Sequence, residues 1–155
     1  MSTIPTPTHY REPDWFTRNV MNRCVMGLTR LGVSVWGSRI LEVRGRRSGL
    51  PRRNPVNLLA VEGRSYLVAP RGDTEWVRNA RGAGEVVLLL GRRRDHYVAH
   101  ELADEEKPRI LRAYVRRWRA ESGVFFDGAT ADSSDDEIAR IAPRHPVFRL
   151  EPEVR

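Results

Sequence analysis

The spacing of short apolar segments between residues 40 and 102 is the feature that most limits how this chain can fold. Each segment is rich in Val, Leu or Ile, and turn residues such as Glu62-Gly63 separate it from the next. A parallel βαβ unit needs a crossover of about a dozen residues or more, so this spacing disfavours a Rossmann domain and favours an antiparallel meander. The predicted strands are Ile40–Arg44, Asn54–Val61, Ser65–Pro70, Glu85–Leu90, Asp95–Leu102 and Pro146–Leu150.

Few helices accompany these strands, so the predicted fold class is α+β with a small barrel of mostly antiparallel strands. Residues 1–13 are rich in Pro and Thr and are expected to form a flexible tail. The remaining residues, 14–155, are enough for one domain with a single core and too few for two.

Four segments have helical character. Residues 14–35 have an apolar stripe, and beyond Asp14 their charged residues are all arginine. Such a basic amphipathic helix packs on its own domain or lies on an anionic membrane surface, and both interpretations stay open. The other helices are expected over Thr74–Arg81, from Asp104 onward, and from Ser134 to Ala142 with Ser134 as the cap. The helix that starts at Asp104 should bury Ile110, Leu111, Tyr114, Val115 and Trp118.

The charge is strongly basic and is carried almost entirely by arginine. The chain has 27 Lys plus Arg against 20 Asp plus Glu, a formal net charge of +7, and Lys107 is its only lysine. Such a chain attracts acidic partners, and arginine binds phosphorylated or planar anions through paired hydrogen bonds. Cys24 is the only cysteine, so neither an internal disulfide nor a thiolate metal cluster is expected. The first residues lack a signal-peptide core and no apolar run could cross a bilayer, so we expect a cytoplasmic protein.

Segment 45–55, with the sequence GRRSGLPRRNP, is the strongest candidate for binding an anion. The glycines on either side of Arg-Arg-Ser allow successive backbone N–H groups to face one anion. Arg46, Arg47 and Arg52 add guanidinium groups, and the Ser48 hydroxyl adds another donor. The alternative is an ordinary solvated hairpin turn, because the segment matches neither a Walker loop nor GxGxxG.

A second segment, residues 69–79 with the sequence APRGDTEWVRN, places the end of a strand before the start of a helix. Arg71 lies at this junction, where free amides and the helix dipole favour negative charge. Trp76 and Asn79 are three residues apart and share one face of the helix. Trp76 either walls an aromatic ligand or belongs to the core.

The two segments together resemble the deazaflavin-dependent nitroreductase family, whose members use coenzyme F420 on a split β-barrel fold. The family pattern combines a Gly-Arg-basic-Ser-Gly turn, an Arg and Asn-Pro, an Ala-x-basic-Gly strand end and a Trp-x-x-Asn helix. This chain has all of them in that order, and its closing HPVFRLEP is similar to the family's last strand. The resemblance implies an oxidoreductase in which reduced coenzyme F420 transfers a hydride to a small conjugated, quinone or nitro-type acceptor. The cofactor carries this chemistry, so no catalytic side chain is implied.

The resemblance also implies which residues bind the cofactor. Its phosphate and acidic tail would lie at Arg46, Arg47, Ser48 and Arg52. The deazaflavin would run beside Asn54, Pro55, Val56 and Asn57, with its pyrimidine end at the backbone amides and charge of Ala69, Pro70 and Arg71. The wall would be completed by Trp76, Arg78 and Asn79.

Other functions and partners stay open on the residues alone. The same barrel could bind FMN, since split barrels often use an ordinary flavin, or the chain could be a non-catalytic basic binding protein, either of an anionic membrane through residues 14–35 or of nucleic acid. Of these two partners nucleic acid is not the expected one, because the only aromatic residues between Leu41 and Leu90 are Tyr66 and Trp76. His96 and His100 can share a strand face, but no third ligand lies at a useful spacing, so no metal is expected. Analogy with other split barrels favours a homodimer.

Overall fold

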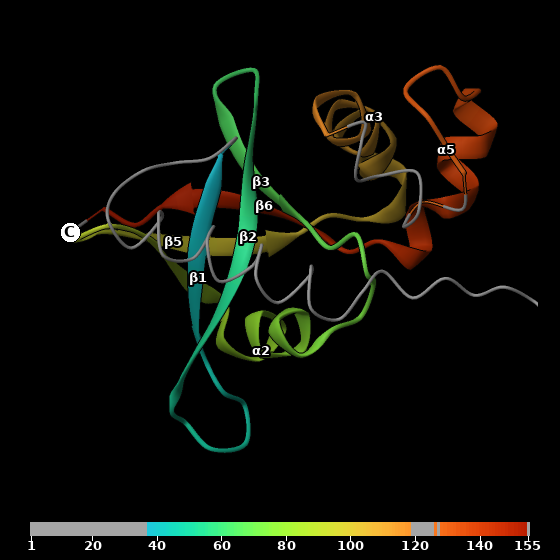
Figure 1. The fold of residues 1–155 in the computed structure, drawn as a ribbon. Helices are drawn as coiled ribbons and strands as arrows, with labels where there is room; N and C mark the ends of the chain where they lie inside the picture. The colour runs from blue at the N-terminus through green and yellow to red at the C-terminus, as the bar shows by residue number, and fades with distance from the viewer. Residues whose placement is uncertain (1–36, 119–125, 127, 155) are drawn as a thin grey trace, which may run out of the picture.

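The computed structural model describes residues 37–118, 126 and 128–154, and within them six antiparallel strands close into a barrel (Figure 1). The strands follow one another around the barrel in the order β1-β2-β3-β6-β5-β4. Their bounds are β1 Ser38–Arg44, β2 Pro51–Val61, β3 Arg64–Val68, β4 Glu85–Leu90, β5 Arg93–Glu101 and β6 Val147–Pro152. The predicted α+β split barrel is confirmed.

The strand bounds differ from the predicted ones mainly where polar residues hide the strand pattern. β2 begins at Pro51 rather than Asn54, and β5 begins at Arg93 rather than Asp95. Both extensions are rich in arginine, which the apolar alternation could not mark as strand. β3 is shorter than predicted and ends at Val68, because the following residues turn away toward α2.

Alternate side chains of the strands fill the barrel interior. Leu41 pairs with Leu88 across β1 and β4, and Leu67 pairs with Phe148 across β3 and β6. This interior cluster consists of Leu41, Val43, Leu67, Ala69, Val77, Ala80, Val86, Leu88, Phe148 and Leu150. Two of its members, Val77 and Ala80, come from helix α2, Glu75–Ala83, so this helix adds to the barrel core.

A second layer of core lies outside the barrel, where helices α3, Lys107–Arg117, and α5, Asp135–Ile141, lie side by side (Figure 1). Short 3-10 turns, Asp104–Glu106 and Ala142–Arg144, precede α3 and follow α5. Leu59 and Tyr66 of β2 and β3 contribute to this layer, and the face predicted for the helix from Asp104 is buried there. The Ser134 hydroxyl accepts a hydrogen bond from the Glu137 N–H at 3.2 Å, which confirms the predicted cap.

The predicted tail 1–13, the predicted helix 14–35 and Cys24 lie outside the described residues. None of the described helices is both long enough and apolar enough to span a bilayer.

Candidate functional site

Gly45 and Gly49 shape the turn that joins β1 to β2. The Gly45 N–H donates to Leu50 O at 2.8 Å, and the Gly49 N–H donates to Gly45 O at 2.9 Å. Gly49 has φ +71°, in the left-handed region that favours glycine. A Cβ on Gly45 would lie 2.8 Å from Ser48 Oγ and 3.2 Å from Leu50 O, so a larger residue would force the turn to shift.

The segment between β3 and α2 is equally tight. Gly72 has φ +83°, its N–H donates to Ala69 O at 3.1 Å, and a Cβ there would lie 3.1 Å from Arg144 O. The Thr74 N–H then donates to Gly72 O at 2.9 Å, and α2 begins at the next residue. This geometry directs α2 back under the barrel, at the end where the β1–β2 turn also lies (Figure 1).

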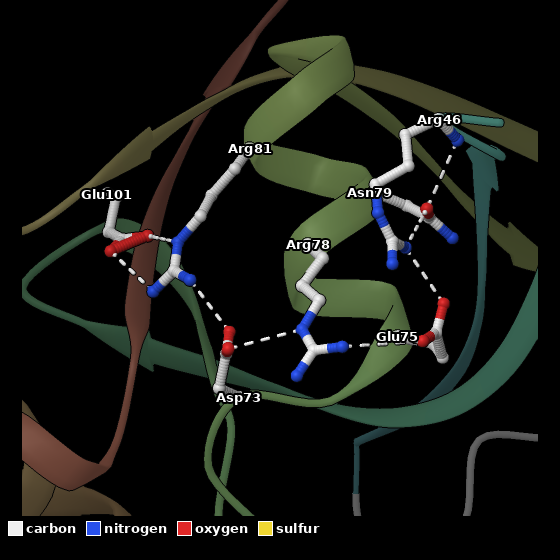
Figure 2. Close-up of polar contacts among 7 residues, drawn as sticks. All are labelled: Arg46, Asp73, Glu75, Arg78, Asn79, Arg81 and Glu101. Atoms are coloured by element: carbon white, nitrogen blue, oxygen red, sulfur yellow. Dashed lines mark hydrogen bonds and ion pairs between the residues drawn. The ribbon is translucent and has the colours of Figure 1, made fainter.

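Arg46 is where the two predicted segments meet. Its backbone N–H donates to Asn79 Oδ1 at 3.1 Å, and its Nη1 donates to the same oxygen at 3.0 Å. Nη1 also donates to Glu75 Oε2 at 2.8 Å (Figure 2). Asn79 is buried in α2, so it holds both the backbone and the side chain of the turn against the helix. The structure thus brings segments 45–50 and 75–79 together.

Two further arginines of this segment are exposed. Arg47 and Arg52 are exposed and form no hydrogen bond or ion pair with the described part of the chain. By contrast, Arg53 donates to Glu42 at 2.9 Å, and Arg78 is paired with Asp73 at 3.2 Å. Segment 45–52 therefore offers two guanidinium groups that the described part of the fold does not use.

An alternating chain of acids and arginines runs along α2 (Figure 2). Glu101 pairs with Arg81 at 2.6 Å, Arg81 with Asp73 at 2.7 Å, and Asp73 with Arg78 at 3.2 Å. Hydrogen bonds from Arg78 and the nearby charges of Arg78 and Arg81 hold the pKa of Asp73 below its ordinary value. Arg78 was expected to wall the cofactor, and here its guanidinium is shared between Asp73 and, at 3.6 Å, Glu75.

The sequence did not single out Asp73, Glu75 and Glu101, the acids in this series of ion pairs along α2. The spacing of Glu75 and Arg78, one helical turn apart, was the one available signal. The Arg46–Glu75 pair joins residues 29 apart in sequence and the Arg81–Glu101 pair joins residues 20 apart, so only the fold reveals them.

The amides expected from residues 69–71 are fewer than predicted. The Ala69 N–H donates to Pro146 O at 2.9 Å and is thus used inside the fold, and Pro70 has no N–H to offer. Arg71 is exposed at the start of this loop. Among residues 69–71, the contribution expected toward the cofactor is therefore narrowed to Arg71.

The β2 residues expected beside the deazaflavin do not share one face, because side chains alternate along a strand. Val56 packs against the barrel interior, which places Asn54 on that same side, whereas Pro55 and Asn57 lie on the other. Trp76 is half-buried and packs on the interior cluster, with its ring centroid 5.8 Å from that of Phe148. Trp76 therefore packs as part of the core, and only the exposed part of its side chain is available for contact with a ligand.

His96 and His100 do not form a metal site with other residues described here. His100 Nε2 lies 2.9 Å from Glu151 Oε2, and no group of three or more His, Cys, Asp or Glu side chains is arranged to hold a metal within the described ranges.

Comparison with known proteins identifies one matching family. The model of the family described as F420H(2)-dependent quinone reductase matches residues 10–125. No curated protein matches the sequence.

Several solved structures have a similar fold. One, titled as a domain-swapped dimer, is 22% identical with a TM-score of 0.52, and the match covers 90% of this chain and 100% of that one. The F420-H2 dependent reductase FDR-A is also 22% identical with a TM-score of 0.52, over 77% of this chain and 100% of that one. A Listeria innocua protein provisionally assigned as a pyridoxamine 5'-phosphate oxidase is 14% identical with a TM-score of 0.52, over 86% and 94% of the two chains. At these identities the likeness is one of fold.

Proposed function

Because the chain belongs to the F420H(2)-dependent quinone reductase family, we propose that it binds the anionic part of coenzyme F420 at the arginine-rich turn 45–52 and reduces a small quinone or similarly conjugated acceptor. Family membership itself makes the chain an F420-dependent reductase. The binding residues and the acceptor are the proposal.

The observation that supports the proposal is that two guanidinium groups of segment 45–52, those of Arg47 and Arg52, are exposed and form no ion pair with another described residue. Coenzyme F420 has a phosphodiester and a glutamate tail, which are anions that arginine binds with charge-assisted hydrogen bonds. Arg47 and Arg52 form no hydrogen bond or ion pair within the described ranges, and the neighbouring Arg46 is hydrogen-bonded to Asn79 of α2. The residues present therefore fit a phosphorylated, acidic ligand.

When bound, the coenzyme supplies a hydride from its reduced deazaflavin ring. The protein's task is then to bind, to orient and to exclude water. Asn79 fixes Arg46, and the packing of Trp76 on Phe148 stiffens the neighbouring surface of α2. No nucleophile or general base is needed for these roles.

A quinone is proposed as acceptor from the family description, and a nitro compound or another conjugated compound is the competing choice. The distinction can be made by following the absorbance of reduced coenzyme F420 with a naphthoquinone, a nitroaromatic compound and an enone in parallel. Fastest turnover of the naphthoquinone is expected. Turnover of the nitroaromatic compound alone would contradict the quinone proposal.

Substitution of Arg46→Ala together with Arg52→Ala tests the proposed cofactor site. We expect the Kd for coenzyme F420, measured from the cofactor's fluorescence, to rise more than tenfold, a loss of about 1.4 kcal/mol or more. The matched control is Arg116→Ala with Arg140→Ala, which removes two exposed charges from α3 and α5 and should leave the Kd nearly unchanged. The same titration with FMN tests the alternative flavin. Unaltered F420 affinity in the first variant would show that the turn is not the binding site.

We also propose a homodimer, supported by the similar structure titled as a domain-swapped dimer. Light scattering of the purified chain at several concentrations measures its mass directly, and a monomer mass throughout would rule the dimer out.

A further inference from the structure

We propose that the Glu75 carboxylate stays paired with the Arg46 guanidinium until an anionic ligand displaces it. Asn79 keeps Arg46 in place before and after this exchange. The inference rests on the proposed function, since it concerns the same turn, and it assigns positioning roles to two residues of α2.

The two partners of Arg46 differ in how firmly they are held. Asn79 is 4% exposed, and its Oδ1 binds both the backbone N–H and Nη1 of Arg46. The Glu75 side chain is 73% exposed, whereas that of Arg46 is only 25% exposed. The amide is thus a fixed anchor, and the carboxylate is a movable partner on the solvent side.

The Glu75 carboxylate has the same chemistry as the ligand group that would replace it. It accepts from Arg46 Nη1 at 2.8 Å, as a phosphate or carboxylate oxygen of a ligand would. The hydrogen bond from Arg46 and its positive charge, with smaller contributions from Arg78 and Arg47, hold the pKa of Glu75 below its ordinary value. Glu75 is therefore an anion at neutral pH, and it lowers the positive charge that the β1–β2 turn presents before a ligand binds.

Displacement would not leave Glu75 without a cation. Its other oxygen, Oε1, lies 3.6 Å from Arg78 Nη1, so the carboxylate can remain with Arg78 when Arg46 turns to a ligand. Ion pairs as exposed as this one contribute little in water, so the exchange is easily reversed. Arg46 Nε and Nη2 form no hydrogen bond with the described residues and are open to a second ligand oxygen.

Substitution of Glu75→Gln tests the displacement directly, through binding rather than activity. The probes are coenzyme F420, followed by fluorescence, and inorganic pyrophosphate, followed by calorimetry. We expect both to bind about three- to tenfold more tightly to the variant at low salt, with the gain shrinking as salt is added.

The matched control is Glu101→Gln. It removes the same charge from an exposed carboxylate that is paired with an arginine of the same helix, Arg81, but it leaves Arg46 and Glu75 untouched. The control should change both affinities less than twofold. Equal tightening in the two variants, or no tightening in Glu75→Gln, would overturn the inference. Failure of the wild-type chain to bind coenzyme F420 would instead overturn the proposed function, and the pyrophosphate titration would still decide the role of Glu75.

The role of Asn79 is tested by its coupling to Arg46. Asn79→Ala should weaken F420 binding in the wild-type background and should have a clearly smaller effect when Arg46 is already alanine, because only the bond to the backbone N–H of residue 46 is then left to lose. An equal loss in both backgrounds would show that Asn79 acts independently of Arg46. Thermal melting identifies the folded variants, and Asn79→Ser, which keeps an oxygen acceptor, replaces the alanine variant if that one does not fold.

Discussion

At the scale of single residues, the arginine-rich turn is organised by one carboxamide oxygen. Asn79 Oδ1 binds the backbone and the side chain of Arg46 at 3.1 and 3.0 Å, so the guanidinium is oriented before any ligand arrives. Preorganisation of this kind reduces the side-chain entropy that binding would otherwise cost. Gly45 is the other requirement, because its hydrogen atoms leave room for Ser48 Oγ and Leu50 O.

Gly45→Ala should therefore disturb the turn as well as the binding of the cofactor. Its Cβ would lie 2.8 Å from Ser48 Oγ, so the hydroxyl must rotate away from the Leu50 N–H that donates to it, and we expect a loss of about 1 kcal/mol in the free energy of unfolding. We also expect weaker binding of coenzyme F420, measured by fluorescence titration beside urea unfolding. Gly82→Ala is the control, since its Cβ would make an ordinary 3.6 Å contact with Arg46 Cβ and a helical alanine should add about 0.5–1 kcal/mol. A Gly45→Ala variant of wild-type stability and affinity would show that the turn tolerates the methyl group.

At the scale of strands, the Glu42 side chain links β1 to β2 and β5. Its carboxylate, only 12% exposed, accepts hydrogen bonds from Arg53 of β2 at 2.9 Å and from Arg94 of β5 at 2.6 Å. Burial on its own would raise the pKa of Glu42, but the hydrogen bonds from Arg94 and Arg53 outweigh it and hold the pKa below its ordinary value. The network thus joins β1 to β2 and, across β4, to β5.

The sign of this pKa shift predicts how acid affects the barrel. A carboxyl group whose pKa is lowered by folding stabilises the fold above its ordinary pKa of 4.5, and this contribution is lost as the pH falls through the lowered value. Glu42→Gln should therefore cost about 1 kcal/mol of unfolding free energy at neutral pH and much less near pH 3, as measured by urea unfolding. Glu85→Gln, in a strand carboxylate without an ion pair in the described ranges, is the control. A loss for Glu42→Gln that is the same at both pH values would contradict this explanation.

The strands and helices could largely be predicted from the sequence, but their contacts could not. Short apolar segments bounded by turn residues located all six strands, and helical spacing found the buried face of α3. The start of β2 at Pro51 was missed because Arg52 and Arg53 follow it. The site motifs singled out Arg46 and Asn79, but their bond joins residues 33 apart in sequence, which no local pattern can show.

At the scale of the whole molecule, the net positive charge matters for how an anionic ligand reaches the β1–β2 turn. The chain has a formal net charge of +7, and on the β1–β2 segment Arg47 and Arg52 are exposed and form no ion pair with another described residue. The interior cluster, which includes Val43 of β1 and Val77 of α2, packs beside this turn without those arginines. We expect a polyanion to be attracted by this net charge at long range and to bind at the proposed site on the β1–β2 turn.

The association rate of coenzyme F420 should accordingly depend on salt. Between about 20 mM and about 300 mM ionic strength we expect the rate constant from stopped-flow fluorescence to fall roughly tenfold, because screening shortens the reach of the charges. Arg47→Ala with Arg52→Ala should associate more slowly at low salt and show a flatter dependence. A rate that ignores salt in the wild-type chain would argue against electrostatic attraction at this end.

The β1–β2 turn stands beyond the strand contacts that close the barrel. β1 pairs with β4 only through Ile40, Leu41 and Glu42, whereas the Arg44–Pro51 pair that leads into the turn has no neighbour on that side. Arg47, Ser48 and Leu50 can thus be exchanged without touching the strand pairing, whereas Gly45 and Arg46 keep the turn in its place beside α2. Substitutions in this one loop can therefore change which ligand binds, while the strand pairing that closes the barrel stays the same.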